Sequence, residues 1–360
     1  MKMCQALARN GVEVTLLAPN RYREFEDIEK DIFTHYSVEN SFSFKYLTWL
    51  SFLKGRSYLY EIFCVIYIIF SKPNLVFTRR IFAAFLSSLA RRNTILELHA
   101  PIEGVFNTLL FRSLIQMRHL RRIVVITRYL RDNIVKNYSG ASKLILVAPD
   151  GADSLAGKKI KIKKFGGDRV SIGYCGHLYQ GKGIELIEKL AEIATDHDFH
   201  IVGGSKVDIS YWKKRCSNIG NIFFHGYVSP DEVKAYLHAF DLVLLPNQPV
   251  VRCTTNPGSV PSKSDIGRWT SPLKLFEYMA LGKVIVASDL PVLREILVNN
   301  GNAILCSHDN AEEWKIEIDR ILLDKDRFYR LGSQALVDFE ENYSWEQRAA
   351  VCIKPFCDSL

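Results

Sequence analysis

The stretch Ser271–Asp289, SPLKLFEYMALGKVIVASD, reads as a helix that leads directly into a buried strand. Ser271 is a residue type that caps helix starts, and Pro272 suits the first helical position. Gly282 marks the helix end, and the apolar, β-branched run after it is typical of a strand. A helix joined to a buried strand by a short turn is the repeating unit of an α/β fold.

Two side chains of this helix are unusual for their positions. At 100° per residue Leu273, Phe276 and Ala280 share one face. Glu277 falls at the edge of that face, so we expect its carboxylate to be partly desolvated, while Lys274 lies at the positive end of the helix dipole. An anion at the helix start and a hydroxyl-rich ligand along Glu277 would explain both. Alternatively, Lys274 reaches into water and Glu277 meets a basic side chain.

The composition is that of a globular protein with room for two domains, with 360 residues, of which 48% are hydrophobic and 24% charged. Residues 1–150 carry 21 Lys and Arg against 12 Asp and Glu, whereas the remainder carries 26 against 27. A basic half suits an acidic substrate or a membrane surface, and the lack of finger or RNA-binding motifs disfavours nucleic acid. Eight scattered cysteines make no metal-ligand spacing and read as reduced thiols of a cytoplasmic protein.

Apolar runs alternate with helical patterns along the whole chain, which predicts parallel sheets covered by helices on both faces. The expected strands are residues 12–19, 74–80, 94–101, 123–127 and 144–151, then 170–176, 199–204, 222–227, 242–246, 283–288 and 302–306. The Lys- and Gly-rich stretch Gly157–Arg169 is the best linker candidate. We therefore expect two doubly wound, Rossmann-like domains, at residues 1–160 and 165–344.

The first domain lacks an expected element, because the sequence opens inside a helical pattern at residues 2–11 instead of a strand and a glycine-rich turn. We therefore expect the first strand of this domain to be missing. In doubly wound sheets ligands bind beyond the carboxyl ends of the strands, and here two sets of such ends could face one central cleft.

The stretch Gly173–Ile187, GYCGHLYQGKGIELI, reads as a strand, a glycine-bearing loop and a helix. Small residues let the backbone approach a phosphate, and His177 and Lys182 supply donors and positive charge. Together with Ser271–Asp289 it resembles the nucleotide-sugar domain of glycosyltransferase family 4, a group of retaining enzymes with the GT-B architecture. IVGG (201–204) and HGYVSPDEVKAYLHAFDLVLLPN (225–247) extend the resemblance in the expected order.

The first half resembles the acceptor domain of the same family, through KPNLVFTRR (72–80), ELHAP (97–101) and VITRYLRDNI (125–134). ENYSWEQRA (341–349) resembles the closing segment of the family, whose helix, at about residues 345–360, returns to complete the first domain. The resemblance thus covers nearly the whole chain.

The resemblance implies roles for individual residues. Glu277 would bind the ribose hydroxyls of the donor, Lys182 would contact its diphosphate, and His99 would face the transferred sugar from the acceptor domain. The other donor-binding residues implied are Gly176, His177, Gly181, Ser271, Leu273 and Lys274. Lysine, backbone N–H groups and a helix dipole can stabilise a departing nucleoside diphosphate. We therefore expect no metal and no cofactor other than the donor, a UDP- or GDP-sugar.

Two positions depart from the family pattern. The first of two glutamates spaced eight residues apart falls on Trp269, and the arginine after the strand glycine is His177, which makes phosphate affinity depend on pH. The polar segment Asn247–Thr270 reads either as a lid over the donor or as an insertion.

The longest apolar run, Tyr58–Phe70, is interrupted by Glu61 and is shorter than the roughly 20 residues of a bilayer span. Neighbouring aromatic and basic residues resemble an interfacial segment; they are Phe42, Phe44, Lys45, Tyr46, Trp49, Phe52, Lys54 and Arg56. Two interpretations stay open, a buried helix or attachment to a membrane surface.

The sequence therefore predicts a retaining, metal-independent glycosyltransferase that moves a sugar to a glycan or lipid-linked acceptor in surface polysaccharide or glycolipid synthesis. We expect it in the cytoplasm, at the inner face of the membrane through peripheral contact. The alternative is a degenerate or truncated nucleotide-sugar-binding homologue without transferase activity. An epimerase or a phosphorylase on the same architecture is disfavoured, since no acid–base set or cofactor lysine is recognisable.

Overall fold

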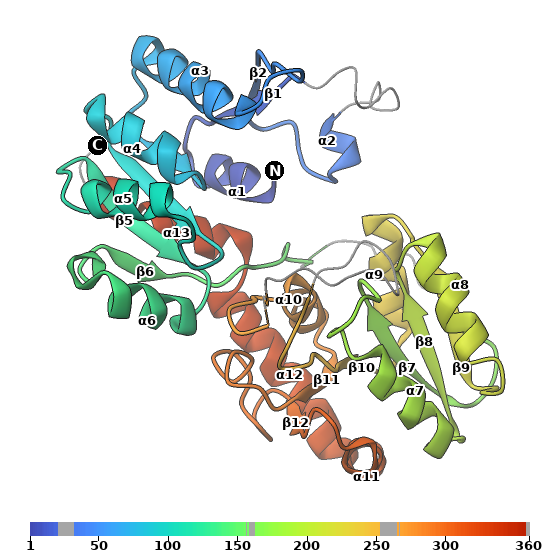
Figure 1. Cartoon of the computed structure of the whole chain (residues 1–360). Coiled ribbons are helices and arrows are strands. Elements are labelled where there is room, and N and C mark those ends of the chain that lie inside the picture. The colour runs from blue at the N-terminus through green and yellow to red at the C-terminus, as the bar shows by residue number, and fades with distance from the viewer. Residues whose placement is uncertain (21–31, 156, 158–162, 253–264, 266, 358–360) are drawn as a thin grey trace. The chain divides into compact units, whose positions relative to one another are not determined.

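A computed structural model, drawn in Figure 1, describes residues 1–20, 32–155, 157, 163–252, 265 and 267–357. The chain forms two compact units. Unit 1 combines Met1–Pro149 with Trp345–Leu360, and unit 2 is the continuous segment Asp150–Ser344. Unit 1 is therefore built from both ends of the sequence.

Unit 1 contains two separate parallel sheets, a pair β1-β2 and a four-stranded sheet in the order β3-β4-β5-β6. Its strands are β1 (Thr15–Pro19), β2 (Ser43–Leu47), β3 (Val76–Thr78), β4 (Thr94–Leu98), β5 (Leu120–Val125) and β6 (Ile145–Val147). Its helices are α1 (Lys2–Arg9), α2 (Ile32–His35), α3 (Arg56–Ser71), α4 (Ile81–Leu89), α5 (Val105–Leu114), α6 (Arg128–Asn137), the 3₁₀ turn η1 (Ser139–Ala141) and α13 (Trp345–Cys357).

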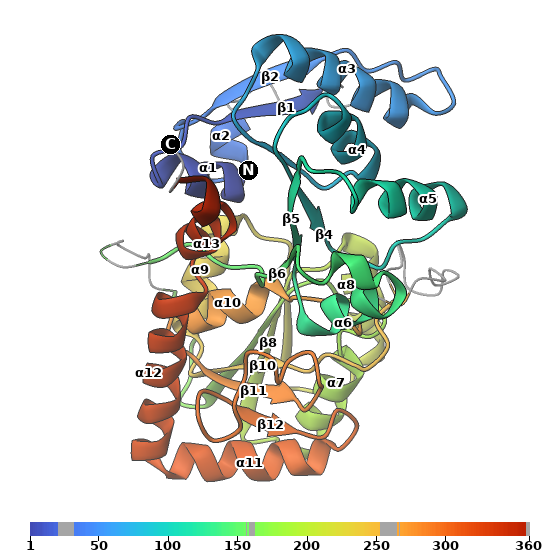
Figure 2. The same ribbon diagram turned by 90° about the vertical axis from the view of Figure 1, so that its left-hand side faces the viewer.

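The last helix of the chain belongs to the core of unit 1. Figure 2 shows α13 on one side of β4 and β5, with α4 and α5 on the other. Cys352 of α13 is fully buried in one cluster with Ile95 and Val124 of the sheet, and Ala349 packs in another against α1. The expected return of the C-terminal helix to the first unit is thus found.

Unit 2 is a six-stranded parallel sheet in the order β12-β11-β10-β7-β8-β9. Its strands are β7 (Val170–Cys175), β8 (His197–Val202), β9 (Ile222–Gly226), β10 (Leu242–Leu245), β11 (Val284–Ser288) and β12 (Ile304–Cys306). Its helices are α7 (Ile184–Ile193), α8 (Lys206–Arg215), α9 (Pro230–Ala239), α10 (Leu273–Ala280), α11 (Ala311–Leu323) and α12 (Lys325–Asn342).

Helices cover both faces of the unit 2 sheet, as the continuous apolar strands predict. One core cluster joins the sheet to α7, α8 and α11, with Trp314 fully buried, and a second joins it to α9, α10 and α12. Figure 2 shows α7 and α12 on opposite sides of the sheet. The strand order changes direction between β10 and β8 at β7, so the loop after β7 lies where doubly wound sheets bind ligands.

The structure corrects two expectations about unit organisation. The strand β2 was not predicted, because its residues read as part of the aromatic and basic segment. The first unit ends at Pro149, before the stretch Gly157–Arg169 that we took for the linker. Phe165 of that stretch stacks on His200 of β8, with ring centroids 3.9 Å apart, so its described part packs on unit 2.

No helix in the described residues is long and apolar enough to cross a membrane. The apolar run Tyr58–Phe70 lies within α3, which buries Cys64, Val65 and Ile68. Tyr58, Ile62, Ile66 and Ile69 form an exposed stripe on the same helix, between 37% and 45% accessible. The buried-helix interpretation therefore holds for one face of α3 only.

Candidate functional site

The loop after β7 depends on glycines for its course. Gly176 has a φ of 152°, and a Cβ placed on it would lie 1.9 Å from the Nζ atom of Lys274. Gly181 has a φ of 90°, and its Cβ would lie 2.4 Å from the carbonyl oxygen of Val250. The Gly181 carbonyl also accepts a hydrogen bond from the N–H of Gln248 at 3.0 Å. Side chains at these two positions would displace the groups that shape the loop.

Lys274 of α10 turns toward this loop. Its Nζ donates to the Tyr174 hydroxyl at 3.0 Å and lies 4.3 Å from the centroid of the Tyr174 ring. Burial and the charge of Lys182 lower the pKa of Lys274 to about 7, against smaller opposing effects of Cys175 and Glu277. The alternative in which Lys274 reaches into water is therefore wrong. A desolvated ammonium beside a second lysine favours the approach of an anion.

Lys182 and His177 complete a basic group around the loop. Lys182 is 7% exposed, and its Nζ lies 5.2 Å from the centroid of the Tyr179 ring. His177 is exposed, and its carbonyl accepts a hydrogen bond from the Tyr174 hydroxyl at 2.7 Å. Burial, Lys274 and Lys182 all lower the pKa of His177 below its usual value. His177 is therefore mainly neutral at pH 7.

The start of α10 differs from the expectation by one residue. Pro272, not Ser271, occupies the N-cap position, and among the described residues no side chain caps this end. The Ser271 hydroxyl instead accepts a hydrogen bond from the N–H of Asp150 at 3.1 Å. At the other end of α10 the prediction is confirmed, since Leu281 is the C-cap and Gly282 follows with a φ of 60°. The N–H of Leu275 already donates to the Pro272 carbonyl at 2.9 Å, so an anion at this helix start would be bound by the N–H groups of Leu273 and Lys274.

The buried face of α10 agrees with the expectation at Phe276 and Ala280 but not at Leu273. Leu275, Phe276, Met279 and Ala280 pack into the core, whereas Leu273 is 49% exposed and Glu277 is exposed too. Leu273 and Glu277 are four residues apart, so they share the outer stripe of the helix. The predicted desolvation of Glu277 is therefore wrong, since its side chain lies at the surface.

A hydrogen bond fixes α10 against the end of β7. The Tyr278 hydroxyl, fully buried, accepts a hydrogen bond from the N–H of Cys175 at 3.0 Å. A buried N–H left without its acceptor costs about 1–3 kcal/mol. Tyr278 therefore holds the helix that carries Lys274 and Glu277 at a defined place beside the glycine loop.

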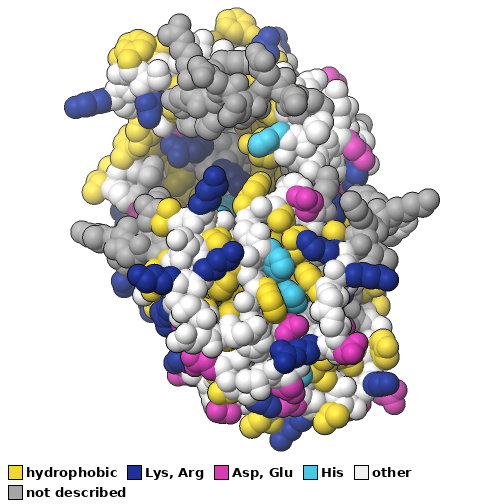
Figure 3. Space-filling view, turned by 90° about the vertical axis from the view of Figure 1, so that its right-hand side faces the viewer, with side chains coloured by type: hydrophobic (Ala, Val, Ile, Leu, Met, Phe, Trp, Pro, Cys, Tyr) yellow, Lys and Arg dark blue, Asp and Glu magenta, His cyan; other side chains and the backbone are white. Residues whose placement is uncertain are grey.

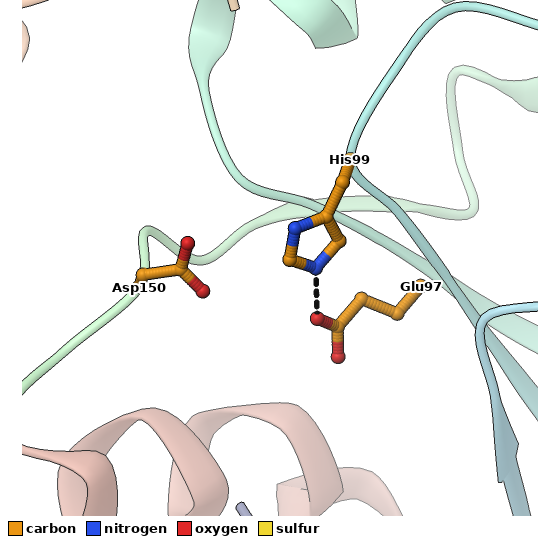
Figure 4. A group of neighbouring side chains, drawn as sticks. All are labelled: Glu97, His99 and Asp150. Carbon is orange, nitrogen blue, oxygen red and sulfur yellow. Dashed lines mark hydrogen bonds and ion pairs between the residues drawn. The ribbon is translucent and has the colours of Figure 1, made fainter. Parts of the chain in front are cut away.

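His99 lies in unit 1, directly after β4. Its Nε2 makes a hydrogen bond with Oε1 of Glu97, which Figure 4 shows as a dashed line. Glu97 is 1% exposed and also pairs with Arg79 at 2.9 Å and Arg348 at 3.3 Å. Sequence reasoning selected His99 but missed Glu97, although a charged residue inside an apolar strand was a visible signal.

The predicted donor-binding residues and His99 belong to different units. Unit 2 brings together Gly176, His177, Gly181, Lys182, Ser271, Leu273, Lys274 and Glu277, whereas His99 belongs to unit 1. The middle of the segment Asn247–Thr270, residues 253–264 and 266, lies outside the described residues, so the lid stays a prediction. Trp269 is half-buried at the position of the expected glutamate.

Metal independence also stays a prediction. Asp196, His197 and Asp319 bring ligand atoms within 4.8 Å of one another in unit 2. Lys315 already contacts Asp319 at 2.5 Å, and His197 Nε2 lies 3.0 Å from the same carboxylate, so this group reads as an ion-pair network. Described cysteines such as Cys175 and Cys352 are free and buried.

Two family models match the chain. Glycosyltransferase Family 4 covers residues 1–154, and Glycosyl transferases group 1 covers residues 169–324. An uncharacterized glycosyltransferase of Methanocaldococcus jannaschii is 24% identical over 235 residues, covering 62% of this chain and 55% of the relative. A putative teichuronic acid biosynthesis glycosyltransferase of Bacillus subtilis, TuaH, is 24% identical over 207 residues, covering 53% and 48%. The chain thus spans about half the length of these curated relatives.

The fold is shared with solved structures. The crystal structure of Anabaena HepE in complex with UDP superposes with a TM-score of 0.69 at 15% identity, covering 100% of this chain and 95% of HepE. At this identity the likeness concerns the fold, which is the α/β GT-B architecture.

Proposed function

Since the chain belongs to the family 4-like glycosyltransferases, we propose that it transfers a sugar, with retention of configuration, from a UDP- or GDP-sugar to a glycan or lipid-linked acceptor. The observation that carries this proposal is the basic group around the glycine loop of unit 2. Burial disfavours the charge of Lys274, and the nearby charge of Lys182, itself 7% exposed, disfavours it further. A diphosphate removes that cost when it binds.

The same basic group around the glycine loop would also assist the departure of the diphosphate during transfer. When the bond between the sugar carbon and the diphosphate oxygen breaks, negative charge grows on the diphosphate. Lys182, Lys274 and the N–H groups of Leu273 and Lys274 at the start of α10 would stabilise this charge by electrostatics alone. We therefore propose a reaction that needs no metal ion. Attack of the acceptor on the face from which the diphosphate departs would retain the configuration.

Glu277 supports a nucleotide as the carrier of that diphosphate. Its exposed carboxylate lies one turn after Leu273 on the outer stripe of α10, close to the helix start. Two ribose hydroxyls can donate to one carboxylate, and such charge-assisted bonds are stronger than neutral ones. HepE was crystallised with UDP, which makes UDP the first nucleotide to test.

We assign the acceptor to unit 1, where His99 follows β4 at the carboxyl edge of the sheet. The name of the Bacillus subtilis relative, which refers to teichuronic acid, makes a surface polysaccharide or glycolipid the acceptor class to test first. The basic excess of residues 1–150 suits such an anionic or membrane-bound acceptor.

Peripheral membrane contact at the cytoplasmic face forms part of this proposal. The exposed stripe of α3 ends in Phe70, which is 81% exposed, and Phe52, before the helix, is 79% exposed. In Figure 3 hydrophobic and basic side chains both reach the surface of unit 1, in the upper part of the view. An apolar stripe flanked by Lys54, Arg56 and Lys72 is typical of binding to anionic lipid.

Calorimetric titration of UDP, GDP and ADP into the whole chain tests the donor site. Binding of one nucleotide that is lost in Glu277→Ala supports the proposal, and transfer from the matching nucleotide sugar to a lipid-linked acceptor completes it. Nucleotide binding without transfer to any acceptor would favour the degenerate homologue, and no binding at all would refute the donor site. Sedimentation with anionic vesicles at low salt tests the membrane contact, with Ile66→Asp expected to weaken it.

A further inference from the structure

Glu97 is a buried carboxylate of one strand that meets His99 from the end of the same strand and two arginines from other parts of unit 1. It lies in β4, all five residues of which are buried. Its Oε1 atom is hydrogen-bonded to His99 Nε2 and to Arg79 Nη2 at 2.9 Å, and it forms an ion pair with Arg348 Nη2 at 3.3 Å. Arg79 follows β3 and Arg348 comes from α13, so three separate elements converge on a single oxygen atom.

This convergence keeps Glu97 ionised. Burial alone raises the pKa of a carboxylate, but the hydrogen bond from His99 and the charges of Arg348 and Arg79 outweigh burial and lower the pKa of Glu97 to about 2. Arg348, itself 2% exposed at the side chain, also donates from Nε to the Pro149 carbonyl at 2.8 Å. Arg348 thereby ties Glu97 to the last residue of the first segment of unit 1.

The arrangement selects one state of the His99 ring. Because Nε2 faces an ionised carboxylate, a neutral ring carries its proton on Nε2 and donates it to Glu97. Nδ1 then keeps its lone pair and can accept a hydrogen bond. A sugar hydroxyl is a donor of the matching kind. Without Glu97 the ring could rotate and take either tautomer.

We propose that Glu97 is a positioning residue, which holds the His99 ring in the Nε2–H tautomer with Nδ1 presented to a hydroxyl of the substrate. Arg79 and Arg348 maintain the charge on Glu97 that this requires. The inference rests on the proposed function, because it gives His99 a role at the transferred sugar. Its experiments are therefore chosen to include one that does not depend on transfer.

Unit 1 offers a matched control. Glu61 of α3 is also a buried glutamate, 3% exposed, and pairs with Arg80 at 2.7 Å. Its second oxygen accepts the N–H of Ala83 at 3.0 Å. No imidazole is among its described partners. Glu61→Gln therefore removes a buried charge from the same unit without touching His99.

The kinetic test compares Glu97→Gln, His99→Ala, the double variant and Glu61→Gln in the whole chain. We expect Glu97→Gln to lower kcat about tenfold or more, with donor KM unchanged. The reason is that in the wrong tautomer Nδ1 of His99 can no longer accept a hydrogen bond in the reacting geometry. If Glu97 acts through His99, the double variant is no slower than His99→Ala alone. Additive losses, or an unchanged kcat in Glu97→Gln beside a slow His99→Ala, would overturn the proposal.

The second test reads the ring directly. Nitrogen-15 NMR of histidine-labelled protein reports which ring nitrogen carries the proton, and the signals of His99 are assigned by their loss in His99→Gln. We expect protonated Nε2 and bare Nδ1 in the parent chain and in Glu61→Gln, and a mixture of tautomers in Glu97→Gln. A parent chain with the proton on Nδ1 would refute the inference even if transfer occurs. If no donor is turned over, the proposed function fails, but the NMR measurement still shows whether Glu97 sets the tautomer of His99.

Discussion

The low pKa of Lys274 predicts that donor binding weakens as the pH rises through neutrality. With a pKa of about 7, roughly nine-tenths of the Lys274 side chains are charged at pH 6 and one-tenth at pH 8. If the diphosphate binds the charged form, the Kd rises about tenfold between these two pH values, or about 1.4 kcal/mol. Binding also raises the pKa of Lys274, so the complex takes up close to one proton at pH 8.

Isothermal titration with UDP-glucose measures both effects, because the diphosphate of this donor has no proton to lose in this range. Repeating the titration at pH 8 in buffers of different ionisation enthalpy gives the number of protons taken up. Lys274→Met should bind weakly at both pH values, with no proton uptake. A Kd independent of pH in the parent chain, or a pH dependence that survives in Lys274→Met, would refute the reasoning.

Lys283 supplies the control. Burial lowers its pKa to about 8, but its Nζ donates to the carbonyls of His238 and Phe240, at 2.8 and 2.6 Å. It precedes β11, at the opposite end of the strand from the ligand-binding edge. Lys283→Met should therefore change stability while leaving the pH dependence of donor binding intact.

Four further outcomes are expected. Glu277→Gln should weaken UDP binding about tenfold or more in calorimetry, without lowering the thermal midpoint, because its side chain is exposed; Glu340→Gln is the exposed control. Gly181→Ala should destabilise unit 2 by about 1–3 kcal/mol in urea unfolding, since its φ of 90° and the Val250 carbonyl both oppose a Cβ. Tyr278→Phe should cost about 1–3 kcal/mol by the same measurement, and an unchanged midpoint would contradict its bond to Cys175. Glu97, whose pKa falls to about 2 on folding, contributes about 3 kcal/mol above pH 4.3 that is lost as the pH falls toward 2, so Glu97→Gln should flatten the acid limb of the stability profile.

The sequence was informative where a pattern follows directly from local geometry. Buried parallel strands appear as continuous apolar runs, and those predicted for unit 2 are all present in the structure. The glycine loop was visible because Gly176 and Gly181 sit between a strand and a helix. The strand β2 was not, since it is short and only partly buried, and its Phe44 and Tyr46 resemble an interfacial segment.

The site was less accessible to such reasoning because side-chain partners come from distant parts of the chain. On α10 the apolar residues allow two stripes, and only the packing against the sheet shows that Phe276 faces inward and Leu273 outward. The environment of Lys274 depends on Tyr174, a hundred positions earlier. Arg348 reaches Glu97 from the last helix, a pairing that no spacing rule predicts.

The division of unit 1 between the two ends of the chain has a consequence for synthesis. Residues 150–344 leave the ribosome as one uninterrupted segment, so unit 2 can complete its core while unit 1 still lacks α13. Until that helix emerges, the sheet surface around Ile95 and Val124 has no cover from Cys352, and α1 has none from Ala349 and Ile353. The unit whose synthesis begins first is therefore the last to complete its core, and its sheet stays partly uncovered until α13 is made.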